Sequence, residues 1–463
     1  MLTIPRGALS VANSDDHIGR KLLHMKFRFV CKCVNISHNI YETLRLQRDG
    51  SVITIMLASL SLSLSSCGGD GSTPPPASAV PTGSATTPTP SVTTPPPVTT
   101  SAPTSDVVDG VMATSAAVAA IAKIALPAIA SNFDIDSELV PAWGTGAIPD
   151  SAAPDVVGAF RFICTASHES YDDPIVYPGQ AGKSHLHEFF GNSGTNANST
   201  YASLRTTGNS TCTSKVNRSG YWMPAMLNGK GSIVRPNFVS IYYKRLPSTS
   251  PECQREGKAC VDLPRGLRFI FGYNMLDMSA APTGEAYFNC QGPGSTPGHY
   301  ATIVEAAKYC PTGAQLGAII SAPNCWDGVN LDSADHRSHV AYGSYGTWGY
   351  YRCPTTHPYV IPTFTLGAWF TTDDDLNRSG TWDGTMNSWH LSSDEMMGGK
   401  IPGSTFHSDW WGAWDDKVLA MWSENCIDKL LNCSGGDLGN GKQMKQSDGF
   451  SWTASPRLVP LPK

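Results

Sequence analysis

The stretch "SIVRPNFVSIYYKRL" at residues 232–246 is rich in β-branched and aromatic side chains. Similar runs follow at 266–275, "GLRFIFGYNM", and at 358–370, "PYVIPTFTLGAWF". Runs of this kind, separated by Gly, Pro, Asn and Ser, are typical of the strands of a mainly β domain. No repeat with a period of about 20 to 50 residues is evident, which argues against a propeller or solenoid. We therefore expect one β-rich domain over residues 140–463, a loop-rich β-sandwich or jelly-roll-like fold with few short helices.

Composition and charge exclude one class of partner. Charged residues make up only 15% of the chain, and the formal net charge is −5. The chain therefore has no basic field that would hold nucleic acid or anionic lipid. We expect no nucleic-acid partner.

The cysteines predict a disulfide framework. Three of the 13 cysteines precede residue 70, and the other ten lie between residues 164 and 433. Ten is an even number, and these ten form uneven spacings without a Cys-x-x-Cys pair, which favours disulfides over zinc knuckles. Closing a loop of about eight residues costs little entropy, so the spacing predicts the pairs Cys253–Cys260 and Cys426–Cys433.

The segment 45–67 has the pattern of an export signal. Arginines at 45 and 48 precede a short apolar run that ends in Leu64-Ser65-Ser66-Cys67. The run is too short to span a membrane as a stable helix. Its ending resembles the lipobox of bacterial lipoproteins, which implies that Cys67 carries the lipid and becomes the first mature residue. The alternative is an ordinary cleaved signal with an incidental cysteine.

The remaining N-terminal segments set the organisation of the chain. Residues 1–44 precede the signal, and we expect them not to be part of the mature protein. Residues 68–105 are rich in Pro, Thr and Ser and are predicted to form an extended, disordered stalk. Residues 106–139 are predicted to be a short helical lead-in, with a helix within 107–131. The protein is thus expected outside the cytoplasm, held at the membrane by a lipid anchor or secreted.

The motif "GKSHLHEFFGN" at residues 182–192 places two histidines one residue apart. In an extended segment His185 and His187 point to the same face, because side chains alternate with period two. Both imidazoles would then address one ion or one substrate.

Two further segments concentrate histidine and aspartate. "CWDGVNLDSADHRSHVAY" at 325–342 holds Asp335, His336 and His339 in a loop, and carboxylates and imidazoles this close can bind a divalent cation or form acid/base pairs. "GSTFHSDWWGAWD" at 403–415 sets His407 two residues before Asp409 and beside tryptophans, which suit a sugar site because a pyranose face stacks on indole. The alternative for all three segments is a structural network of satisfied histidines and turn-capping aspartates.

The same motifs resemble a known family. "DPIVYPGQAGKSHLHEFFGN", "CWDGVNLDSADHRSHVAY" and "GSTFHSDWWGAWD" are similar to the secreted microbial domain of unknown function nineteen ninety-six, over about residues 155–435. Some members of that family carry carbohydrate-binding modules, which implies an extracytoplasmic protein with a polysaccharide or cell-wall glycan as partner. The resemblance places Asp173 and the histidine and aspartate residues of the three segments on the family's polar motifs.

Three hypotheses of function follow. The first is a surface-anchored protein that binds or cleaves polysaccharide. In its enzymatic form the protein would be a glycoside hydrolase or polysaccharide lyase, with the catalytic residues Asp335, Asp409, His185, His187 and His407. The substrate-binding residues are then Asp173, His336, His339, Trp326 and Trp410. The second is a non-enzymatic copper or zinc site with ligands from His185, His187, His339 and His407, and the third is a structural surface protein.

Overall fold

The computed structural model describes the backbone of 40–48 and 51–59, and residues 125–143, 147–151, 156–279, 283–345, 350–396 and 398–463. The chain contacts divide it into two compact units, Met1–Thr100 and Ser101–Lys463. In the first unit, β1 (Ile40–Arg48) pairs with β2 (Ser51–Ser59) as an antiparallel two-stranded sheet. This hairpin covers part of the predicted export signal. Cys67 and the stalk at 68–105 lie outside the described residues, so lipidation of Cys67 stays a prediction.

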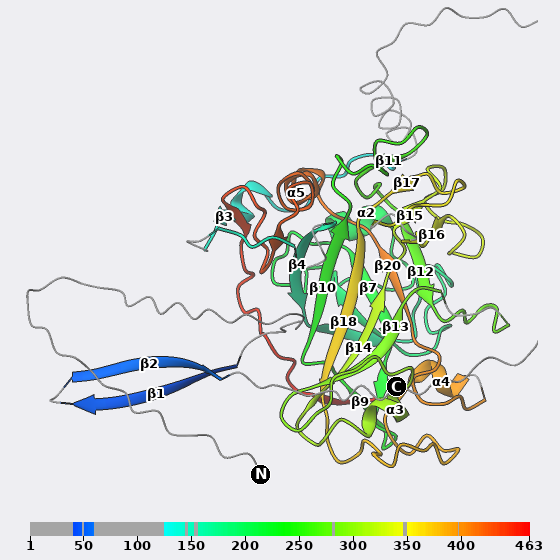
Figure 1. Cartoon of the computed structure of the whole chain (residues 1–463). Coiled ribbons are helices and arrows are strands. Elements are labelled where there is room, and N and C mark those ends of the chain that lie inside the picture. Colours follow the sequence, from blue (N-terminus) through cyan, green and yellow to red (C-terminus); the bar gives the residue numbers. More distant parts are fainter. Residues whose placement is uncertain are drawn as a thin grey trace, which may run out of the picture. The chain divides into compact units, whose positions relative to one another are not determined.

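The second unit is built on two large sheets (Figure 1). The six-stranded sheet has the order β13 (Ala286–Gln291), β14 (Gln315–Ser321), β18 (Thr363–Thr371), β10 (Phe238–Arg245), β4 (Gly158–Cys164) and β21 (Asn432–Cys433). Within β10, alternate residues are buried, as the quoted sequence pattern requires of a strand with one face in a core.

The five-stranded sheet carries most of the polar motifs. Its order is β12 (Arg268–Gly272), β20 (His407–Trp411), β7 (Gly220–Pro224), β6 (His187–Gly191) and β5 (Ala166–Ser170), and all its pairings are antiparallel. The segments around residues 187 and 407 are therefore neighbours across β7, although they are far apart in the sequence.

The two sheets pack face to face around one aromatic core. Phe364 of β18 contacts Phe271 of β12 and Trp410 of β20, each with ring centroids 5.6 Å apart. The hydroxyls of Tyr221 on β7 and Tyr243 on β10 are 2.8 Å apart and form a hydrogen bond inside this core. The expected β-sandwich is confirmed.

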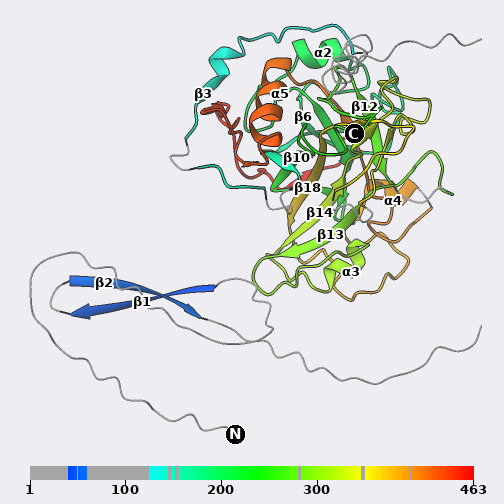
Figure 2. The ribbon, with the colours of Figure 1, turned by 45° about the horizontal axis from the view of Figure 1, so that its top comes forward.

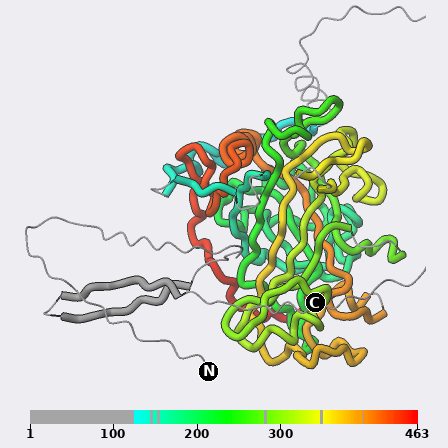
Figure 3. Tube along the Cα trace, in the orientation of Figure 1, coloured from blue at the N-terminus to red at the C-terminus, as the bar shows by residue number. Residues whose placement is uncertain are grey.

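Smaller sheets and short helices border the sandwich (Figure 2). One four-stranded sheet contains β11 (Ala259–Cys260), β17 (Tyr359–Val360), β15 (Cys325–Trp326) and β16 (Val340–Ala341). A second contains β19 (His390–Leu391), β8 (Met226–Leu227), β9 (Ser232–Val234) and β23 (Leu458–Pro460), and β22 (Lys442–Met444) pairs with β3 (Leu139–Pro141). The C-terminal segment, red in Figure 3, adds strand β23 to the second of these four-stranded sheets, where β23 pairs with β9.

The helices are short, as expected. Among the described residues they are α2 (Tyr201–Thr206), α3 (Ile303–Ala307), α4 (Ser392–Met396) and α5 (Asp416–Trp422), with a π-helical turn at Ser423–Ile427. The predicted helix within 107–131 falls largely outside the described residues. Residues 125–131 are not helical, and the described part of the lead-in contains only a 3-10 turn at Asp136–Glu138.

Five disulfides involve all ten cysteines between residues 164 and 433. The predicted pairs Cys253–Cys260 and Cys426–Cys433 are present. The other three are Cys164–Cys212, Cys290–Cys310 and Cys325–Cys353. Such a framework fits a domain that folds in an oxidising compartment. Among the described residues no helix has the length and apolar character needed to cross a membrane.

Candidate metal centre

Strand β20 presents two polar side chains on the face of the five-stranded sheet that points away from the core. His407 and Asp409 share this face because residues two apart in a strand point the same way, while Trp410 between Asp409 and Trp411 points into the sandwich. Both polar side chains are nevertheless buried, since loops cover this face of the sheet. The predicted proximity of His407 and Asp409 is thus a consequence of strand geometry.

His187 and His185 reach the same face from β6 and the bend before it. His187 is the first residue of β6, and His185 lies in a bend that precedes the strand. The expectation that both project from one strand was therefore wrong in detail. The two rings still meet, with centroids 4.1 Å apart, because the bend turns His185 back over His187.

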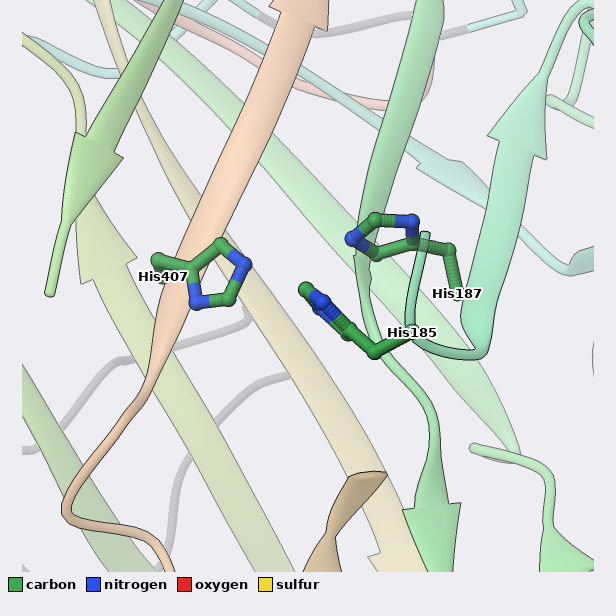
Figure 4. Close-up of side chains that lie close together, drawn as sticks. All are labelled: His185, His187 and His407. Carbon is green, nitrogen blue, oxygen red and sulfur yellow. The ribbon is translucent and has the colours of Figure 1, made fainter. Parts of the chain in front are cut away.

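The three histidines form one cluster, which we call the triad: His185, His187 and His407. The centroid of His185 lies 5.1 Å from that of His407, and the centroids of His187 and His407 are 6.1 Å apart. Figure 4 shows His185 between the other two rings. One nitrogen from each ring lies within 4.8 Å of the corresponding nitrogens of the other two.

Backbone carbonyls set the tautomers of two triad rings. The Nδ1 of His187 lies 3.0 Å from the carbonyl oxygen of Asp172, and the Nδ1 of His407 lies 2.8 Å from that of Thr405. A carbonyl oxygen only accepts, so each Nδ1 carries the proton and donates it. In a neutral ring the Nε2 of His187 and of His407 is then an acceptor with a free lone pair.

Two other nitrogens of the triad lack partners. The Nε2 atoms of His185 and His187 are buried and make no hydrogen bond. Burial of such atoms without a partner costs free energy, so nearly all buried polar groups in proteins are paired. The unpaired nitrogens of the triad therefore call for a ligand.

Burial keeps the triad neutral. Desolvation lowers the pKa of all three imidazoles, and for His407 it lowers the pKa to about 3. The neighbouring histidines lower the pKa of His185 further, whereas the Asp173 carboxylate opposes the shift at His187. Neutral imidazole is the form that binds a metal ion.

The triad opens onto a cavity of about 120 Å³. His185 and His407 line it together with Asp173, Asp409 and Arg337. Neither carboxylate oxygen of Asp409 has a hydrogen-bond partner, and burial raises the pKa of Asp409 well above its usual value, with Asp173 adding to the shift and Arg337 opposing it. The cavity wall therefore combines the unpartnered carboxyl group of Asp409 with the unpartnered Nε2 of His185.

The comparisons with known proteins add a family to this geometry. Residues 173–414 match the family model described as "Domain of unknown function (DUF1996)". The chain belongs to this family. The match begins at Asp173 and includes the triad, Arg337 and Asp409, so the whole cavity wall named above lies within the DUF1996 domain. No curated protein and no solved structure matches the chain.

The 325–342 loop of the DUF1996 domain was expected to add Asp335, His336 and His339 to the site, and these three residues do not line the cavity. His339 bonds Ser333 and the carbonyl of Arg268 through its two ring nitrogens, and the Nδ1 of His336 lies 2.9 Å from Asp332. These histidines are satisfied structural residues. This part of the sequence hypothesis, including His339 as a metal ligand, is not supported by the geometry.

Asp335 caps a turn instead of facing Asp409. Its Oδ1 accepts hydrogen bonds from the hydroxyl of Ser333 and from the backbone N–H groups of Arg337 and Ser338. Partial burial opposes ionisation of Asp335, but these hydrogen bonds together hold its pKa below the usual value. An exposed carboxylate engaged in this way does not form the expected acid/base pair with Asp409.

The two tryptophans proposed to stack on a sugar lie in the core. Trp410 packs against Phe269 with ring centroids 5.1 Å apart, and the indole Nε1 of Trp326 donates to the carbonyl of Asn330. Both side chains are fully buried and neither lines the cavity. Stacking on a ligand requires an exposed ring face, so these assignments were wrong. Asp173, in contrast, lines the cavity as a substrate-binding residue would.

The sequence hypothesis passed over Arg337, which is the contribution of the 325–342 loop to the cavity. Its Nη1 and Nη2 donate to the carbonyls of Gly272 and Tyr273 at the end of β12, at 3.1 and 2.8 Å. Its Nε is buried without a partner. Backbone carbonyls thus hold the guanidinium in place beside Asp409.

Two buried aspartates position the triad and were also missed. Asp172 accepts hydrogen bonds from the backbone N–H groups of Gly182 and Ala197, which fixes the loop whose carbonyl holds His187. Asp394 of α4 accepts from the N–H and the hydroxyl of Thr405, whose carbonyl holds His407. In each case the signal is a tertiary contact that the sequence does not display.

Proposed function

We propose that this DUF1996 domain binds one transition-metal ion, zinc or copper, between His185, His187 and His407. The observation that carries the proposal is the convergence of three neutral imidazoles, each of which brings one ring nitrogen within 4.8 Å of a nitrogen of the other two. Three lone-pair nitrogens that share a buried site repel one another, and a bound cation converts this repulsion into attraction.

The other buried histidines of the domain support the distinction between a ligand and a structural residue. His168 bonds Ser167 and the carbonyl of Thr195, and His390 bonds the carbonyl of Ser388 and Glu395. Each of these rings has both nitrogens partnered, as a structural network requires. In the triad, the Nδ1 atoms of His187 and His407 each donate to a backbone carbonyl, and the Nε2 of His187 has no partner, which is the usual arrangement of a metal-bound histidine.

The ligand set favours zinc or copper over harder ions. Imidazole suits zinc and copper, whereas calcium and magnesium prefer sets of oxygen ligands. A tetrahedral zinc ion with Zn–N distances of about 2.0–2.1 Å brings its nitrogens to within about 3.4 Å of one another, so small rotations of the three rings suffice. Three protein ligands also leave a coordination position for water or substrate.

The cavity beside the triad favours reactive chemistry over a purely structural ion. A metal ion in such a site lowers the pKa of a bound water molecule to about 7 and polarises substrate oxygens. Asp409 and Arg337 supply a carboxyl group and a fixed cation at the same cavity. We infer that the domain carries out a metal-assisted reaction, such as hydrolysis. The five disulfides support a location outside the cytoplasm, and a lipid on Cys67 would anchor the domain to the membrane.

Metal titration tests the proposal. The mature domain is freed of metal with a chelator and titrated with Zn²⁺ and, separately, Cu²⁺ by calorimetry. We expect one ion per chain for at least one of the two metals, and a loss of about 100-fold or more in affinity for His187→Ala, because a buried ligand is removed.

His299→Ala is the matched control, because His299 is exposed and contacts Glu285 and the ring of Tyr287 far from the triad segments in the sequence. It should bind like the wild type. A wild-type domain that binds neither metal stoichiometrically would overturn the proposal, as would a His187→Ala variant that binds as tightly as the control.

A further inference from the structure

A second and larger cavity shares the wall residues His185 and Met396 with the first. Its volume is about 440 Å³, and its wall includes Tyr171, Ser232, Asn387 and Glu395. His185 and Met396 line both this cavity and the smaller one that contains Asp409. We propose that the two cavities are the halves of one binding groove, in which a linear polysaccharide lies across the triad.

The two shared residues define the crossing point. His185 forms the floor there, since its ring is largely buried and belongs to the triad. Met396, on α4, is 60% exposed. Its side chain can move at the boundary between the two cavities, because methionine is unbranched and flexible. A chain that enters from the larger cavity must pass Met396 and His185 to reach Asp409.

The walls offer what a sugar chain needs. In the larger cavity the amide of Asn387, the hydroxyl of Ser232 and the carboxylate of Glu395 supply hydrogen-bonding groups, and Glu395 is held by the buried ring of His390 at 2.9 Å. Tyr171 adds a partly exposed aromatic ring. Polar groups interleaved with aromatic and aliphatic surface match the hydroxyls and apolar faces of pyranose rings.

In the smaller cavity the same mixture recurs. Asn274, Lys183 and Asp173 provide polar groups, and Ile270 and Leu276 provide apolar surface. Occupants of both cavities would therefore be chemically alike, as successive sugar units of one polymer are.

The position of the triad favours a glycan over a peptide at the crossing point. Extended peptides are usually held by main-chain hydrogen bonds along an open sheet edge. Here the triad lies on the face of the five-stranded sheet, and its histidines come from β20 and from β6 with the bend before it, both flanked by strands on either side. Side chains would therefore recognise the ligand at this point. This suits a polymer that lacks the regular N–H and C=O groups of a peptide main chain.

The inference rests on the proposed metal centre for the chemistry at the crossing, but binding in the groove does not require the ion. Cleavage within a chain, rather than removal of terminal units, would follow from a groove that continues on both sides of the reactive centre.

The experiment uses the mature domain and Met396→Trp, with Met396→Ala as the matched control. Cello-, xylo-, chito- and laminari-oligosaccharides of increasing length are titrated into each protein by calorimetry. For at least one series we expect the affinity of the wild type to rise by about tenfold or more from the disaccharide to the longest oligomer. The indole of Met396→Trp should block the crossing and remove most of this gain, and Met396→Ala should keep it.

A second variant guards against a folding defect in Met396→Trp. Asn387→Ala, at the wall of the larger cavity, should weaken the longest oligomers and leave the disaccharide that binds in the smaller cavity unaffected. Absence of length dependence in all four series, or tight binding of extended peptides in their place, would overturn the groove. Metal content is measured in parallel: oligosaccharide binding without metal binding would overturn the metal centre and leave the groove standing.

Discussion

Acid is expected to destabilise the metal-free domain steeply. His407 should account for a measurable part of the slope of the unfolding free energy against pH. Burial lowers the pKa of His407 to about 3, against about 6.5 in an unfolded chain. Between these values the unfolded state binds a proton that the folded state does not, so stability is lost as the pH falls below about 6.5. Each such group contributes about 1.4 kcal/mol per pH unit.

The measurement compares urea unfolding of wild type and His407→Gln, in chelator, between about pH 6 and pH 4. We expect the unfolding free energy of the wild type to fall more steeply than that of the variant, by about 1.4 kcal/mol per pH unit. Burial also lowers the pKa values of other histidines, such as His168 and His339. Their contributions to the pH dependence are the same in both proteins and cancel in the difference. Equal slopes in the two proteins would show that His407 is protonated in the folded domain.

Asp409→Asn is expected to stabilise the metal-free domain at neutral pH. Burial and the Asp173 carboxylate raise the pKa of Asp409 in the folded domain. At a pH above the pKa of an unfolded aspartate, the unfolded chain therefore ionises more readily than the folded domain, which favours unfolding. Neither of its oxygens has a hydrogen-bond partner. Asparagine cannot ionise, so the variant loses this contribution, and we expect a gain on the order of 1.4 kcal/mol or more in the free energy of unfolding, the energy that corresponds to one pKa unit.

The gain from Asp409→Asn should shrink towards about pH 4, where the unfolded carboxyl becomes protonated as well. Thermal unfolding in chelator at two pH values tests both statements. A loss of stability at pH 7 would mean that attraction between Asp409 and the fixed guanidinium of Arg337 outweighs desolvation. A more stable protein with weaker function would place Asp409 in the reactive machinery, where proteins commonly retain destabilising groups.

The fold follows largely from local sequence patterns. The β-branched and aromatic residues of the 232–246 stretch predicted a strand, which is β10, and the period of two in "HSDWW" puts His407 and Asp409 on one side of β20. The short disulfide loops were also predictable, because closing them costs little entropy. The three long-range disulfides were not, since ten cysteines allow many pairings and only the tertiary fold selects among them.

The candidate site was predictable only in part, because partners far apart in the sequence decide which polar residues are free. His187 and His339 both lie within dense polar motifs. The ring nitrogens of His339 form hydrogen bonds with Ser333, six residues away, and with a carbonyl of β12, whereas the Nε2 of His187 has no partner. Arg337 was passed over because an arginine in a polar loop usually faces solvent. It is half-buried here because carbonyls at the end of β12 accept hydrogen bonds from its guanidinium.

X-ray absorption spectroscopy of the domain loaded with one equivalent of zinc or copper tests the central claim most directly. The account predicts a first shell with three imidazole nitrogens, at about 2.0–2.1 Å for zinc. It also predicts that His185→Ala, His187→Ala and His407→Ala each reduce the imidazole contribution, whereas His299→Ala leaves it unchanged. A shell composed of oxygen atoms, or an imidazole contribution that survives all three triad substitutions, would contradict a metal centre at the triad.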